Sequence, residues 1–145
     1  MNAIFKGILS AVFVLVFCGC SIPTDFYIQN LTETKKTVKV HYTKRTLAEL
    51  AEDSFGTFSF NYENEIVNPS VFKKNKNLKS LEKKVDSSGI TIEIAPHSTV
   101  RIEKTHNYMW DWNILGVDID NQNYNINEIK EKAEKVKDDY IFKIE

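Results

Sequence analysis

The segment ITIEIAPHSTVRI, residues 90–102, contains two runs in which apolar and polar residues alternate strictly. A two-residue period is the pattern of a β-strand with one buried and one exposed face. In the second run Arg101 and Glu103 fall on the polar, outward face. Pro96 has no backbone N–H to donate to a sheet, so it ends the first strand and turns the chain. The segment therefore predicts two strands with a short connection.

The same alternation recurs along most of the chain that follows Asp25. It is found in the ranges 26–42 (two strands joined by the polar turn TETKK), 57–62, 115–119, 124–126 and 140–144. Many short alternating strands separated by polar turns are typical of an antiparallel sandwich or small barrel. We therefore expect a mainly β fold, a small antiparallel β-sandwich.

Helical spacing is confined to a few short segments. Ile129, Ala133 and Val136 recur at helical spacing after Asn127, which predicts a short, Asn-capped helix before the last strand. Residues 46–53 are compatible with one turn of helix. The lysine-rich stretch 68–88 has no strand pattern, and we interpret it as a short helix or a functional loop.

The strand-proline-strand arrangement of ITIEIAPHSTVRI resembles an element common in immunoglobulin-like modules. This resemblance implies an immunoglobulin-like form of the sandwich.

The first twenty residues differ sharply from the rest. Lys6 is followed by ILSAVFVLVF, residues 8–17, which carries no charge. A membrane-spanning helix needs roughly 20 apolar residues, and this run is shorter. The order of a basic region and then a short apolar region is that of a signal peptide, here residues 1–19.

Phe17-Cys18-Gly19-Cys20 at the end of that run resembles the lipobox of bacterial lipoproteins. The resemblance implies that Cys20 is acylated and becomes the mature N-terminus. Phe17 and Cys18 depart from the usual pattern, and an ordinary secretory signal or an uncleaved anchor is the alternative. With lipid on Cys20, we expect a tether over 20–25, a single domain over 26–145, and a location in the bacterial cell envelope.

The lipid would hold the protein on a membrane, and the short tether would keep the domain close to it. Ser21 stands where an aspartate would favour the inner membrane of some bacteria, so we expect the outer membrane. The mature chain would then contain no free thiol and no disulfide, because its only cysteine would carry lipid.

The charge balance argues against nucleic acid as a partner. Without Lys6 the chain has 18 basic and 20 acidic side chains, so no positive field surrounds it.

HNYMWDW, residues 106–112, is the most suggestive candidate site. If this stretch is extended, Tyr108, Trp110 and Trp112 lie on one face and offer a stacking platform for a sugar ring. The alternative is that these aromatic side chains fill the core.

A run of lysines forms a second candidate site, a contact with an anionic surface. Its members are Lys73, Lys74, Lys76, Lys79, Lys83 and Lys84. Anionic lipid head groups, acidic glycans or an acidic partner would suit it, and a solvated loop is the alternative.

No motif of an enzyme or a metal site is present. The segment DIDNQN, residues 118–123, lacks the glycine and glutamate of an EF-hand, and the three histidines have no zinc-ligand spacing. The sequence predicts no cofactor and no metal. Our hypothesis is a non-enzymatic lipoprotein that binds an envelope protein partner; a carbohydrate-binding lipoprotein is the alternative.

Overall fold

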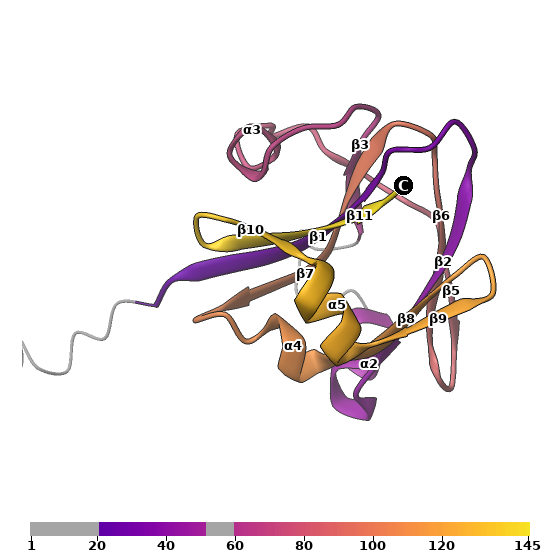
Figure 1. Ribbon diagram of the computed structural model, residues 1–145. Coiled ribbons are helices and arrows are strands. Elements are labelled where there is room, and N and C mark those ends of the chain that lie inside the picture. The colour runs from indigo at the N-terminus through magenta and orange to yellow at the C-terminus, as the bar shows by residue number, and fades with distance from the viewer. Residues whose placement is uncertain (1–20, 52–59) are drawn as a thin grey trace, which may run out of the picture.

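The computed structural model describes residues 21–51 and 60–145, and these form two facing β-sheets (Figure 1). The six-stranded sheet has the order β10 (Glu134–Val136), β11 (Asp139–Ile144), β1 (Pro23–Asn30), β7 (Ser98–His106), β3 (Asn61–Glu63) and β4 (Lys79–Ser80). The five-stranded sheet has the order β5 (Lys83–Asp86), β6 (Gly89–Ile94), β2 (Lys36–Tyr42), β8 (Ile114–Ile119) and β9 (Gln122–Asn125). The predicted mainly β sandwich is confirmed. Cys20 and the preceding residues lie outside the described part.

The core lies between the two sheets, where the apolar faces of the alternating strands meet. Phe26 and Ile28 of β1 and Val38 and Val40 of β2 are fully buried there. Ile94 of β6 is buried with them, as its alternation predicts. Burial of each such side chain is worth about 1.5–3 kcal/mol, so the two-residue period of the sequence determines which faces pack together.

β1, an interior strand of the six-stranded sheet, pairs with two strands that are far from it in the sequence. β1 lies antiparallel to β7 on one side and parallel to β11 on the other. The sandwich is therefore not purely antiparallel, because its first and last strands run side by side in the same direction. β1 also begins at Pro23, three residues before the predicted start, so Thr24 and Asp25 belong to the sheet rather than to a tether.

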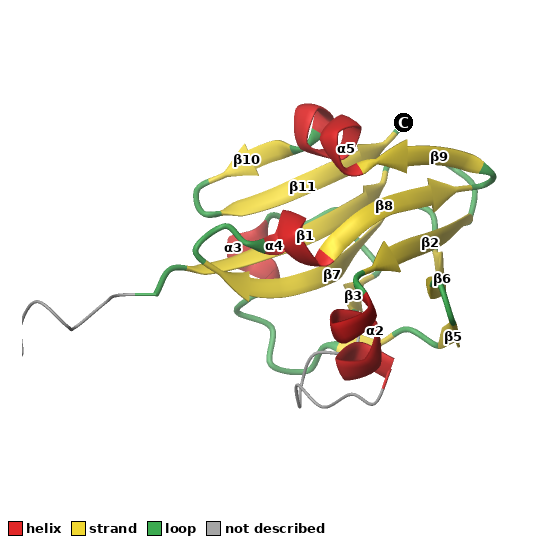
Figure 2. Ribbon diagram, turned by 90° about the horizontal axis from the view of Figure 1, so that it is seen from below, coloured by secondary structure: helices red, strands yellow, loops and turns green. Residues whose placement is uncertain are grey.

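In the part of the chain that the structure describes, four helices flank the sheets (Figure 2). They are α2 (Lys44–Ala51), α3 (Pro69–Phe72), α4 (Trp110–Asn113) and α5 (Ile126–Lys132). Within the described residues, no helix combines the length and the apolar character that crossing a membrane requires.

Helix α5 begins earlier than the sequence predicts, because its N-cap is Asn125 and not Asn127. The Asn125 side chain accepts hydrogen bonds from the backbone N–H groups of Asn127 and Glu128, and the Glu128 carboxylate accepts one from the Asn125 N–H at 2.8 Å. This reciprocal capping box fixes the start of the helix. Val136 lies beyond the helix, in β10, so two strands follow α5.

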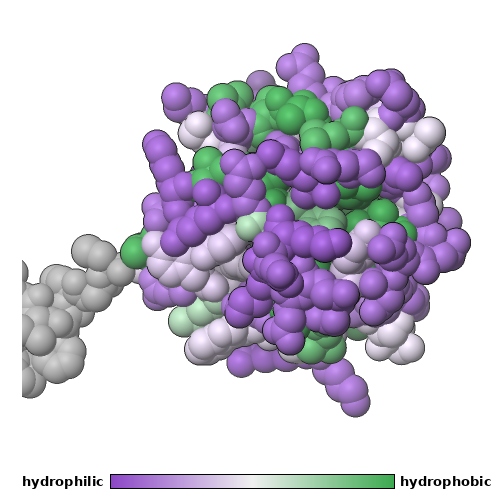
Figure 3. Space-filling view, in the orientation of Figure 1, coloured by the Kyte–Doolittle hydropathy of each residue, from purple (hydrophilic) through white to green (hydrophobic). Residues whose placement is uncertain are grey.

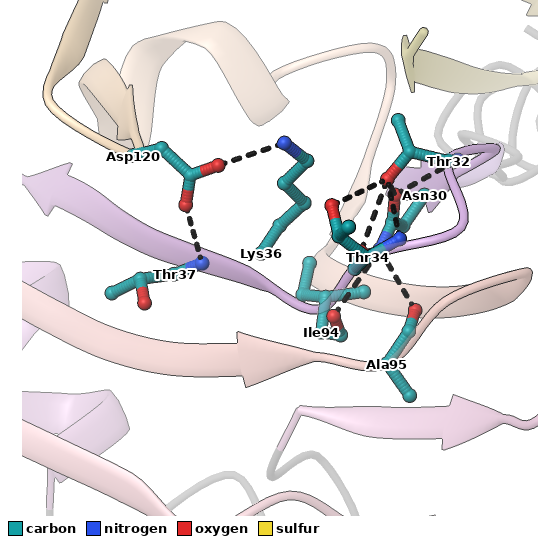
Figure 4. Close-up of polar contacts among 8 residues, drawn as sticks. All are labelled: Asn30, Thr32, Thr34, Lys36, Thr37, Ile94, Ala95 and Asp120. Atoms are coloured by element: carbon teal, nitrogen blue, oxygen red, sulfur yellow. Dashed lines mark hydrogen bonds and ion pairs between the residues drawn. The ribbon is translucent and has the colours of Figure 1, made fainter.

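The far end of β1 is held by a polar corner that connects the two sheets (Figure 4). Asn30 donates to the backbone oxygens of Thr34 and Ala95 at 2.8 and 3.0 Å. In the neighbouring turn Asp120 accepts from the backbone N–H of Thr37 at 3.0 Å and from Lys36 Nζ at 2.8 Å. Because β1 and β2 belong to different sheets, the chain crosses the sandwich at this corner and the two strands do not form a hairpin.

Strand β7 contains a bulge that changes the direction of one side chain. Phe26 is opposite Glu103 and Tyr27 is opposite Arg101, so Ile102 has no partner in the register. Phe26 belongs to the core between the sheets, whereas Tyr27 packs on the opposite face with Phe72 and Ile141. Glu103 therefore lies on the inner side of the sheet, although simple alternation predicts that it points outward.

Candidate ligand-binding cavities

The aromatic segment 106–112 is not extended. Asn107 and Tyr108 have positive φ values of 53° and 63°, and the chain then enters the one-turn helix α4. A turn followed by a helix distributes consecutive side chains around the axis instead of placing alternate ones on one face. The predicted single face of Tyr108, Trp110 and Trp112 is therefore not formed.

The two tryptophans of this segment lie in opposite environments. Trp110 is 2% exposed and stacks on Phe26, with ring centroids 4.3 Å apart and an interplanar angle of 4°. Trp112 is 71% exposed. Tyr108 is half-buried, and its hydroxyl donates to Asp138 Oδ1 at 2.7 Å. Trp110 is thus a core residue, and Trp112 presents its ring to solvent by itself.

The lysine run is divided between the two sheets. Lys73 and Lys76 follow α3 over the six-stranded sheet, whereas Lys83 and Lys84 lie in β5 of the five-stranded sheet. Lys83 also donates to the backbone oxygen of Leu50 at 2.7 Å. The six lysines therefore do not form one continuous surface, because the chain crosses from one sheet to the other after β4.

Cationic side chains from distant parts of the sequence gather instead around a cavity of about 670 Å³ on the outer face of the six-stranded sheet. We call it the basic cavity. Its lining residues are Pro23, Asp25, Asn61, Lys73, Asn75, Lys76, Leu78, Ser80, Arg101 and Lys104. Strands β1, β3, β4 and β7 form its floor, and the segment after α3 forms its wall. Figure 3 shows one face of the molecule, on which hydrophilic residues predominate and smaller hydrophobic patches lie between them.

A buried ionic network supports the basic cavity. Asp25 is 1% exposed, and its Oδ2 accepts from the Tyr27 hydroxyl at 3.0 Å and lies 3.4 Å from Arg101 Nη1. Arg101 also donates to Asn61 Oδ1. Lys73 Nζ is 2.6 Å from Asp139 Oδ1 and 3.9 Å from Asp25 Oδ2. Burial, and then the Asp25 charge, raise the pKa of the Tyr27 hydroxyl.

The network leaves an excess of positive charge at the cavity. Lys73 and Arg101 are balanced by Asp139 and Asp25. Lys76 and Lys104 line the same cavity, and neither forms an ion pair with any residue in the ranges 21–51 and 60–145. These two ammonium groups can therefore accept an anionic partner without breaking an existing pair.

Glu103 forms part of a second cavity, at the end of the sandwich on the inner side of β7. We call it the Glu103 cavity; its volume is about 460 Å³. Its lining residues are Thr43, Arg45, Thr46, Glu49, Leu50, Glu103, Lys104, Thr105, His106 and Asn113. Glu103 is 4% exposed; Asn113 Nδ2 donates to its Oε1 at 3.3 Å, and its Oε2 has no hydrogen-bond partner.

This environment strongly disfavours the charged form of the Glu103 side chain. Burial is the largest cause and raises its pKa from 4.5 to about 8. The Asn113 hydrogen bond lowers the pKa, whereas the negative charges of Asp25 and Glu49 raise it further. A carboxyl group that titrates near neutral pH inside a cavity is a typical property of a binding or catalytic site.

The remaining polar candidates serve the fold. His41 Nε2 lies 2.7 Å from Asp118 Oδ2, and His97 Nε2 lies 3.0 Å from Glu33 Oε2. Asp118 also accepts from Asn123 at 2.6 Å, its partner across the pairing of β8 with β9. In the part of the chain that the structure covers, no three His, Cys, Asp or Glu side chains are placed to hold a metal ion.

Sequence reasoning missed the central residues of both cavities. The sequence pattern predicts a tether at Asp25 and places Arg101 and Glu103 on the outward face of one strand. No local signal marks them, because their burial depends on the pairing of β7 with β1 and on the cover that α2 and α3 provide.

Comparisons with protein-family models, with curated protein sequences and with solved structures gave no match to this chain. The two cavities are therefore interpreted from their own geometry and charge.

Proposed function

We propose that this protein is a lipid-anchored lipoprotein of the bacterial cell envelope, without enzymatic activity, that binds an anionic group of its ligand in the basic cavity. The proposal joins two features: the lipobox-like sequence at Cys20, and the excess positive charge of a cavity that Pro23 helps to line.

The observation that carries the proposal is the position of Lys76 and Lys104 in the basic cavity. Both lysines line the cavity together with Asn61, Asn75 and Ser80, whose amide and hydroxyl groups carry hydrogen-bond donors. A volume of about 670 Å³ is within the range of small-molecule sites. This combination favours a carboxylate or phosphate group over a neutral one.

The anchor gives the cavity a location. Only Ser21 and Ile22 separate Cys20 from Pro23, and they span at most about 11 Å when extended. A lipid on Cys20 would place the basic cavity next to the membrane surface. The ligand would then be an envelope component or partner that is reachable there.

Titration with glycerol 1-phosphate, followed by NMR or calorimetry, tests the binding role. Protein purified from membranes in detergent should bind this phosphate ester more tightly than glycerol, and more weakly at 0.5 M salt because salt screens the lysines. The double substitution Lys76→Ala and Lys104→Ala should weaken binding at least tenfold.

The matched control is the double substitution Lys44→Ala and Lys84→Ala. It removes the same charge from exposed positions outside the cavity. Equal loss of binding in both double variants, or no preference for phosphate over glycerol, would show that the basic cavity does not select an anion.

A further inference from the structure

The Glu103 cavity holds a buried acidic group that the proposed function does not use. The bulge at Ile102 turns Glu103 inward, and only one of its two carboxyl oxygens has a hydrogen-bond partner. A buried polar atom without a partner costs about 1–3 kcal/mol, and more when it is charged. A buried polar atom without a partner in a native structure needs an explanation, and a bound ligand or ion that supplies the partner is one.

The charges around Glu103 indicate which partner fits. The charged groups that act on it are Asp25 on the neighbouring strand β1 and Glu49 on α2, and both are negative. Arg45 also lines the cavity, but its Nε lies 3.1 Å from Glu49 Oε1 and its side chain is 89% exposed. Lys104 and His106 are exposed residues at the end of β7. Among the residues that the structure describes, no Lys, Arg or His side chain forms an ion pair with the Glu103 carboxylate.

Several polar side chains that line the Glu103 cavity offer hydrogen-bond acceptors. They suit a ligand group that carries several N–H bonds. Thr43 and Thr46 contribute hydroxyl oxygens from the start of α2, and Glu49 contributes a carboxylate. An ammonium group carries three donors, so it can bind a carboxylate and hydroxyl oxygens at once. Rotation of the Glu103 carboxyl group about its last side-chain torsion brings either oxygen toward the cavity.

We propose that the Glu103 cavity binds a small molecule through a primary ammonium group, with the Glu103 carboxylate as its counter-ion. This site shares Lys104 with the basic cavity, but Glu103 lines only the Glu103 cavity, and the proposal does not depend on the proposed function. Leu50 and the carbon chains of the wall residues contact the apolar part of the ligand.

Ammonium binding is linked to proton release. In the empty cavity Glu103 is largely protonated at pH 7, because its pKa is raised to about 8 by burial. The bound cation stabilises the carboxylate, so one proton leaves Glu103 for nearly every ligand that binds at pH 7. Affinity should therefore increase by close to tenfold per pH unit between pH 6 and pH 7.

Isothermal titration calorimetry of the detergent-purified full chain with 1,5-diaminopentane tests the proposal. The uncharged 1,5-pentanediol has the same length and is the matched ligand control. Titration in buffers of different ionisation enthalpy measures the protons released. We expect binding of the diamine but not the diol, and release of close to one proton per bound ligand at pH 7.

Two variants complete the test. Glu103→Gln should weaken diamine binding at least tenfold and abolish the proton release, whereas Lys76→Ala changes only the basic cavity and should leave both unchanged. A second probe, Nα-acetyl-lysine N-methylamide, presents the same ammonium group on a peptide unit, and comparison of the two affinities distinguishes a free amine from a lysine side chain.

The wild-type measurement decides the proposal even if Glu103→Gln does not fold. Absence of diamine binding, equal binding of the diol, or binding without proton release would each overturn it. Retention of full affinity and proton release by a folded Glu103→Gln variant would do the same.

Discussion

Replacement of Glu103 by glutamine should make the protein less sensitive to rising pH. Glu103 has a folded-state pKa of about 8 against an ordinary value of 4.5, with burial as the main cause. Between these two values the folded chain keeps a proton that the unfolded chain has released. Stability is therefore lost as pH rises through this window, and it changes little with Glu103 below pH 4.5 or above about pH 8.5.

The magnitude follows from the width of the window. At 1.36 kcal/mol per pKa unit, and with partial titration at both ends, wild type should lose about 3 kcal/mol relative to Glu103→Gln between pH 5.5 and pH 8. Glutamine is neutral throughout and nearly the same shape, so it can keep the contact with Asn113. The free energy of unfolding of the Glu103→Gln variant therefore lacks the pH-dependent contribution of Glu103.

Urea denaturation of both proteins at several pH values measures the effect. The other ionisable groups near Glu103 are Arg45, Glu49, Asp25, Lys104, His106 and Tyr42. They are identical in both proteins, so their titration largely cancels in the difference. A difference between the two proteins that changes by less than about 1 kcal/mol over this range would refute the argument that Glu103 is buried in its neutral form.

Two further predictions concern the aromatic segment and the anchor. Trp110→Ala should reduce the free energy of unfolding by about 3–5 kcal/mol, because it removes a buried ring stacked on Phe26, whereas Trp112→Ala should change it by less than about 0.5 kcal/mol. In agreement with these environments, iodide should quench the fluorescence of wild type much more than that of Trp112→Phe, which retains only the shielded indole. Cys20→Ser should release the protein from the membrane pellet on fractionation, and a variant that stays firmly in the pellet would contradict lipidation at this position.

Local sequence patterns were sufficient to predict most of the strands. β2 follows a two-residue period of burial from Val38 to Tyr42, and β6 does so from Ile90 to Ile94, because one face of each strand is buried and the other is partly or fully solvated. The sequence also contains a recognisable signal for the start of α5, two residues before the predicted cap Asn127. Asn125 and Glu128 have the three-residue spacing of a capping box, which fixes the cap at Asn125.

Irregular pairing limited the prediction of side-chain directions. The bulge in β7 turns Glu103 inward, and another in β8 leaves Leu115 58% exposed while Ile114 is buried. A bulge depends on how two strands align, which a single strand's sequence does not record. The same limit applies to both cavities, since each combines residues from strands and helices that are distant along the chain.

The parallel pairing of β1 with β11 determines when the chain can complete its fold. β1 is synthesised well before one of its two neighbours, β11, which consists of Asp139–Ile144. Contacts between such distant segments carry a high loop-closure entropy and slow the folding of β proteins. Until β11 has been synthesised, one side of β1 lacks its strand partner and offers free backbone groups to other chains. A nascent or C-terminally truncated chain is thus the form most prone to aggregation.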